Sequence, residues 1–178
     1  SNDETTESSS KIPLEFPQLC SSDEILLIDA QTRRNLEITS TQRDNQFQGS
    51  LLWAIDKTLT AMGGRCLRRW LESPLIDRNS ILARQRVVSE LVKSSSLRGD
   101  IRKLLRTMGD LERLAGRAGA GQASGRDLVA ISNGLRKLPR LAGYLQHLSA
   151  KAPDWFKAIT EPDQELSNLA EVISKQLI

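Results

Sequence analysis

The stretch Gly49–Leu75, GSLLWAIDKTLTAMGGRCLRRWLESPL, carries two helical patterns separated by a short turn. Ser50 is a good helix N-cap, and apolar residues follow it at helical spacing. That first apolar face is Leu51, Leu52, Ile55 and Leu59. A second helix should end before Pro74, and its apolar face is Met62, Leu67, Trp70 and Leu71. The stretch therefore predicts a helical hairpin.

The hairpin contains no recognisable catalytic pattern, which favours a mechanical function over a chemical one. Trp53 and Trp70 lie at helical spacing with leucines, so we predict that both rings pack in the core.

Length and composition point to one all-α domain. The chain has 178 residues, of which 39% are hydrophobic and only 4% aromatic, so aliphatic side chains must build most of the core. Two separated cysteines and one histidine give no pattern for a zinc site or a disulfide framework. No apolar run approaches the length of about 18 residues that spans a bilayer, and no signal-peptide pattern is present. We expect a cytoplasmic protein with no membrane contact.

The rest of the chain also shows helical spacing. Predicted N-caps are Asp29, Asp77 or Asn79, Asp110 and Ser124. A strongly amphipathic helix carries Leu97, Ile101, Leu104, Leu105 and Met108. The helix that begins after Ser124 should be kinked or split at Pro139. A last helix, from about Pro162 to Ile178, has no terminating signal, so we expect the natural helix to continue.

Three ordered stretches carry a family resemblance. Residues 58–75 resemble the T-x-T-x-M-G-x-R-x-L-R-x-W-L-x-x-P-L run that opens the core of bacterial MutS mismatch-repair proteins. Leu27–Ile38, LIDAQTRRNLEI, is similar to that family's L-D-A-A-T-R-R-N-L-E-L, and Asp110–Leu128 resembles its passage from D-L-E-R-L to R-D-L. The resemblance covers residues 17–178 and leaves residues 1–16 outside as an acidic tail or linker, expected to be disordered.

The resemblance implies a fold, a function and partners. The fold would be an irregular multi-helix bundle, the first segment of the MutS core or lever domain, ending before the clamp insertion. Its function would be to couple the ATPase and DNA-clamp domains of a dimeric protein that binds mismatched DNA. Partners would be the clamp, connector and ATPase domains, with duplex DNA bound by the full-length protein. A MutS paralogue that acts outside repair stays open.

The resemblance places no catalytic, cofactor or metal residue in this chain; ATP and Mg²⁺ would bind elsewhere in the full-length protein. The glycine-rich run Gly116–Ala123, GRAGAGQA, lacks the lysine and hydroxyl of a phosphate-binding loop, because Gln122 and Ala123 stand in those places. The lone His147 is expected to lie on the surface or in packing.

Arginine clusters inside the family motifs are the candidate site residues. They are Arg33, Arg34, Arg65, Arg68 and Arg69. One interpretation is ion pairing on a helix surface, for instance Arg68 with Glu72 at i, i+4. The other is contact with another domain or with the DNA backbone, where a bidentate arginine pair would contribute more than a surface pair.

Charge is unevenly distributed and leaves a second function class open. Residues 1–30 have a net charge of minus six, whereas residues 95–140 hold ten basic and four acidic residues, a net of plus six. The alternative is therefore a self-contained helical module that binds nucleic acid through residues 95–140. Ordinary solvated helix surface is the competing interpretation of the same charges. A scaffold for another protein is a third possibility.

Overall fold

The structure, a computed structural model, describes residues 25–146, 148, 156 and 159–177. Its helices are α1 (Ala30–Asn35), α2 (Leu51–Ile55), α3 (Ala61–Glu72), α4 (Arg78–Lys93), α5 (Ser95–Arg106), α6 (Leu111–Gly119), α7 (Gly125–Leu135), α8 (Leu138–Leu145) and α10 (Gln164–Leu177). In these residues the β pairing is one isolated bridge between Ile25 and Leu75. The predicted all-α class is confirmed. The predicted tail, residues 1–16, and His147 lie outside the described residues.

Local polar residues start the helices where the sequence predicts. In each predicted cap the side chain accepts the backbone N–H of the residue three positions later, and Asp77, not Asn79, begins α4. These caps are Asp29, Ser50, Asp77, Asp110 and Ser124. Thr60 caps α3 in the same way. Because α2 ends at Ile55, Leu59 lies in the turn of the hairpin and not on its first helix.

The predicted interruption at Pro139 is present. The chain leaves helix α7 after Leu135 and begins α8 at Leu138, with Pro139 in the first turn of α8. In a first turn the missing N–H of proline removes no helix hydrogen bond, so the split accommodates the residue without loss.

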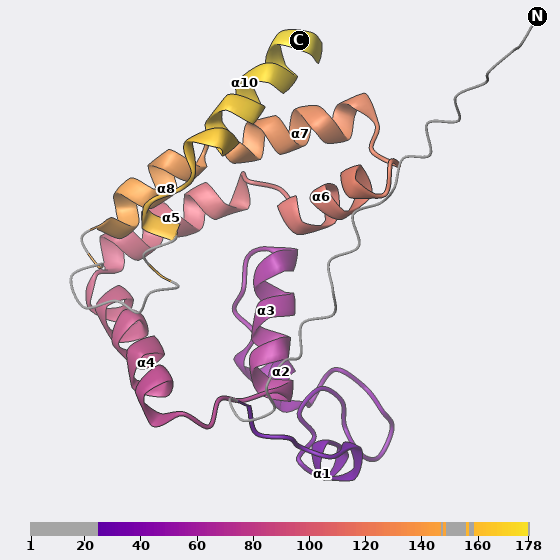
Figure 1. The fold of residues 1–178 in the computed structure, drawn as a ribbon. Coiled ribbons are helices and arrows are strands. Elements are labelled where there is room, and N and C mark those ends of the chain that lie inside the picture. The colour runs from indigo at the N-terminus through magenta and orange to yellow at the C-terminus, as the bar shows by residue number, and fades with distance from the viewer. Residues whose placement is uncertain (1–24, 147, 149–155, 157–158, 178) are drawn as a thin grey trace, which may run out of the picture.

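The helices α5, α6, α7, α8 and α10 form one layered group, from which α4 runs towards α1, α2 and α3 (Figure 1). Helix α7 packs along α10 and against α6, and α5 packs against α8 and α4. Where α7 meets α10, the buried Ser132 hydroxyl donates a 2.7 Å hydrogen bond to the carbonyl of the fully buried Ala170. Small residues therefore bring these two helices together.

Two predicted core tryptophans are not in the core. The exposed fractions are 46% for Trp53 and 39% for Trp70, so the prediction of burial is wrong for both. The spacing correctly placed the rings on helices, but spacing cannot show whether another helix covers that face. Trp53 keeps 46% of its surface exposed, and an arginine covers part of Trp70.

Gly134 allows close approach between α7 and the segment that precedes α6. A Cβ atom added there would lie 2.4 Å from Cδ2 of Leu111 and 3.0 Å from the Met108 carbonyl oxygen. Gly143, an exposed glycine in α8, has no atom within 4 Å of such a Cβ.

We expect Gly134→Val to destabilise the chain by about 1 to 3 kcal/mol, because the added side chain meets a backbone oxygen that cannot rotate away. The matched control Gly143→Val should change stability by less than about 0.5 kcal/mol. Urea unfolding of both variants measures the difference. Equal midpoints would show that the contact at Gly134 is not close.

Candidate functional site

The described chain consists of two packed units connected by α4. We call residues 25–75 the N-terminal unit and helices α5 to α10 the C-terminal unit. An apolar cluster of Val87, Leu145 and Phe156, with Leu91 and Ile101 against it, fixes α4 to the C-terminal unit. The extensive helix contacts lie within the units or between α4 and α5. The contacts between the N-terminal unit and the C-terminal unit include a set of side-chain hydrogen bonds.

The central polar contact is made by Arg65 on α3 with the start of α6. Nη1 and Nη2 of Arg65 donate to Oδ2 and Oδ1 of Asp110 at 2.9 and 2.7 Å. Nε and Nη2 also donate to Oε2 of Glu112 at 2.9 and 2.6 Å. The planar guanidinium thus meets two carboxylates at once, a geometry that lysine cannot reproduce. We call Arg65, Asp110 and Glu112 the arginine joint.

Asp110 has two functions in the joint. Its carboxylate accepts the N–H of Arg113 at 3.2 Å, which caps α6, while it also binds Arg65. Both acidic residues stand at the positive end of the α6 dipole, which favours their charge. The hydrogen bond from Arg65 lowers the pKa of Asp110 to about 2, and the two carboxylates raise the pKa of Arg65.

The other candidate arginines are placed differently. Arg68 pairs with Glu72 on its own helix at 3.1 Å, the i, i+4 pair that the spacing indicates. Arg69 lies at the edge of the joint, with Nη2 4.0 Å from Oε1 of Glu112. Arg33 and Arg34 are exposed in the last turn of α1 and form no ion pair with the described residues. The structure therefore brings Arg65 and Arg69 together at one contact and leaves the α1 arginines apart.

Two further contacts were not predicted. The guanidinium carbon of Arg84 on α4 lies 3.7 Å from the centre of the Trp70 ring on α3, a cation–π arrangement. Arg102 on α5 donates to the carbonyl of Lys57 in the hairpin turn at 3.4 Å. Nothing in the sequence links these pairs, because the two residues of each pair lie in separate segments of the chain.

Six of the ten cations in residues 95–140 contact other groups of the chain. Arg98 donates to the carbonyls of Leu91 and Val92 at 2.6 and 2.8 Å, and Lys137 donates to the carbonyl of Thr107. Further internal partners hold Arg102, Lys103, Arg117 and Arg140. Arg106, Arg113, Arg126 and Arg136 are exposed cations without an ion pair in the described part of the chain.

An ion pair joins the two helices on either side of the glycine-rich run. Nη1 and Nη2 of Arg117 in α6 lie 3.2 Å from Oδ1 and Oδ2 of Asp127 in α7. Nη2 also donates to the carbonyl of Gln122. Asp127 in turn accepts from the backbone N–H of Ser124, forming a capping box. These interactions make the segment a structural connection between α6 and α7.

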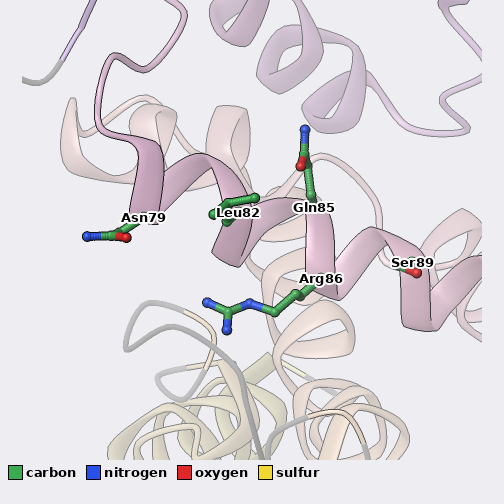
Figure 2. A pocket seen from close by; sticks show the side chains of 5 residues that line it. All are labelled: Asn79, Leu82, Gln85, Arg86 and Ser89. Carbon is green, nitrogen blue, oxygen red and sulfur yellow. The ribbon is translucent and has the colours of Figure 1, made fainter.

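The surface hollows that the described residues line show no converging set of reactive groups. One of about 430 Å³ lies along α4 and is lined by Asn79, Leu82, Gln85, Arg86 and Ser89. In Figure 2 these side chains all come from one helix, and Gln85 and Arg86 point to opposite sides of it. Among the described residues, no group of three or more histidines, cysteines or acidic residues could hold a metal ion. None of the helices in that part of the chain is long and apolar enough to cross a membrane.

Comparison with known proteins identifies relatives along nearly the whole chain. A family model described as MutS domain III matches residues 31–178. The DNA mismatch repair protein MutS of Synechococcus sp. (strain CC9605) is 60% identical over 172 residues, which cover 97% of this chain and 19% of that protein. The DNA mismatch repair protein MutS of Prochlorococcus marinus (strain MIT 9303) is 59% identical over 167 residues, covering 94% and 18%. The chain spans about a fifth of the length of these curated relatives.

We expect Asp110→Asn to lower the melting temperature more than Asp77→Asn does. Asparagine retains the cap in both variants, but at position 110 it also removes the charge that binds Arg65. Asp77 forms no ion pair with the described residues, so it serves as the matched control. Thermal unfolding at neutral pH and low salt measures the two shifts. Equal shifts would contradict a stabilising joint.

The joint should also weaken in acid. The pKa of Asp110 is about 2 in the folded chain, below the ordinary aspartate value of about 3.9. The unfolded state therefore binds more protons between these values, so the contribution of the joint is complete above about pH 4 and is lost as the pH falls towards about 2. Across this interval the stability difference between the original chain and Asp110→Asn should shrink. A constant difference in urea unfolding from pH 5 to about 2 would contradict this.

Proposed function

Because this chain belongs to the MutS domain III family, we propose that it is the lever of a longer mismatch-repair protein, coupling its ATPase and DNA-clamp domains. The relatives are DNA mismatch repair proteins about five times as long as the chain. The proposed partners are the clamp, connector and ATPase domains, duplex DNA and a second full-length subunit. ATP and Mg²⁺ would bind in the ATPase domain, and this segment would carry out no chemistry itself.

The arginine joint is the observation that supports this proposal. A lever needs stiff segments and a defined angle between them. Apolar packing stiffens the C-terminal unit, whereas a forked guanidinium holding two carboxylates sets its angle to α3. Such a contact can break and reform without exposing an apolar core, which suits a joint that responds to ligands.

The alternative, direct nucleic-acid binding through residues 95–140, has less support. Six of the ten cations in that segment have partners within the chain, and those partners compete with phosphate. The exposed Arg106, Arg113, Arg126 and Arg136 remain available. A handful of phosphate contacts would give weak, salt-sensitive binding.

In the full-length protein that contains this chain, we expect Arg65→Ala to reduce the change in mismatched-DNA affinity that ATP produces. Allosteric coupling of about 1 to 3 kcal/mol corresponds to an affinity ratio of about 5 to 150, and a loosened joint should bring the ratio towards about 1. The ratio of dissociation constants with and without ATP is the measurement. The ATPase rate without DNA should stay unchanged.

Arg68→Ala is the matched control, because Arg68 lies on the same helix and its partner Glu72 is also on that helix. This variant should keep the original ratio. If both variants kept it, the arginine joint would have no part in coupling.

For the 178-residue chain alone, we expect duplex DNA to bind no tighter than non-specific contacts do, with a dissociation constant of about 10⁻⁴ to 10⁻⁶ M. Fluorescence anisotropy across a salt series measures it. Binding in the nanomolar range that weakens steeply with salt and is lost in Arg106→Ala with Arg113→Ala would instead establish the nucleic-acid module.

A further inference from the structure

An open apolar groove lies between the end of α3 and the outer face of α4. It has a volume of about 600 Å³, and its lining includes Trp70, Arg84, Val88, Val92 and Lys93. The two valines are 51% and 64% exposed, although they stand beside an aromatic ring. We call this the Trp70 groove. Its volume is within the range of about 300 to 1,000 Å³ that is typical of ligand pockets.

The charge of the Trp70 groove is positive. The guanidinium of Arg84 rests on Trp70, and its buried Nε has no hydrogen-bond acceptor among the described residues. No acidic residue lines the groove, and Lys93 at its far end has one partner, Glu90, at 3.0 Å. An uncompensated guanidinium is costly, and a carboxylate nearby would lower that cost. The groove therefore suits a segment that combines apolar side chains with an acidic one.

The chain itself contains such a segment. Residues Ile12–Leu19 read IPLEFPQL, with Glu15 between apolar neighbours and two prolines that favour an extended backbone. Proline-containing extended segments are commonly bound in grooves lined by aromatic rings. We propose that residues 12–19, which lie outside the described residues, occupy the Trp70 groove, with Glu15 at Arg84 and Phe16 against Trp70 or the valines.

The connection is long enough. Ile25 pairs with Leu75, and Leu26 donates to the carbonyl of Pro74 at 2.7 Å, so the chain is fixed close to the end of α3. Trp70 is five residues from Leu75 and hence within about 18 Å of it, while the six-residue connection from Leu19 to Ile25 spans up to about 20 Å. A short connection gives an effective concentration of about 1 mM, so even a weak contact would be occupied.

The test uses Trp70 as a reporter in the 178-residue chain, with Trp53→Phe and Trp155→Phe to remove the other tryptophans. Leu14→Asp with Phe16→Asp should raise the acrylamide quenching of Trp70, because the ring loses its cover. Thr5→Asp with Ser8→Asp is the control and should leave quenching unchanged.

Adding the synthetic peptide IPLEFPQL to the Leu14→Asp, Phe16→Asp chain should restore the original quenching. Half-saturation below about 0.1 mM is expected, since that affinity gives about nine-tenths occupancy at an effective concentration of about 1 mM. A peptide with Glu15→Gln should bind about tenfold more weakly, because it loses a charge-assisted hydrogen bond. Val92→Asp should abolish peptide binding, whereas Val172→Asp, on the exposed face of α10, should not.

Two results would overturn the proposal. One is equal quenching in the original chain and the Leu14→Asp, Phe16→Asp variant. The other is quenching that changes with protein concentration, which would mean that a second copy covers the groove. Neither result depends on coupling between ATP and DNA, so the proposed lever function stands or falls separately.

Discussion

Among the described residues, the guanidinium of Arg65 carries four of the hydrogen bonds that join the N-terminal unit to the C-terminal unit. Arg65 joins α3 to the first turn of α6, and its partner Asp110 is also the residue that begins α6. The Arg65 side chain is 40% exposed, so solvent screening keeps the strength of the contact modest. The contact mainly fixes orientation, because four hydrogen bonds from Arg65 to two carboxylates permit few orientations of α3 relative to α6.

Different interactions stiffen the C-terminal unit and fix its orientation relative to α3. Apolar burial and the Ser132 contact hold α7 to α10, and the Val87 cluster holds α4 to α5 and α8. Across the joint the contacts are polar and partly solvated, so a small rotation replaces one set of hydrogen bonds with water. The same rotation within the C-terminal unit would open a packed core, which costs far more.

Sequence reasoning predicted what depends on neighbours along the chain. Helix caps, the break at Pro139 and the pair Arg68–Glu72 all involve residues within four positions of one another, so local chemistry decides them. Arg65 and Asp110 are 45 positions apart, and the sequence offers Arg65 several other carboxylates. The same limit explains Trp70: helical spacing placed its ring on a face, but the neighbour that covers it, Arg84, comes from a different helix.

The net charge of residues 95–140 does not show how many of their cations are free to bind a partner. Arg98 reaches the last carbonyls of α4, and Lys137 reaches the carbonyl that follows α5. Helix ends leave such carbonyls without internal partners, and the dipole favours cations there. A chain of short helices has many such ends, so it needs many cations near them. The helical architecture therefore accounts for Arg98 and Lys137, two of the ten cations in residues 95–140. Arg106, Arg113, Arg126 and Arg136, which are exposed and form no ion pair with the described residues, are the cations most open to a partner.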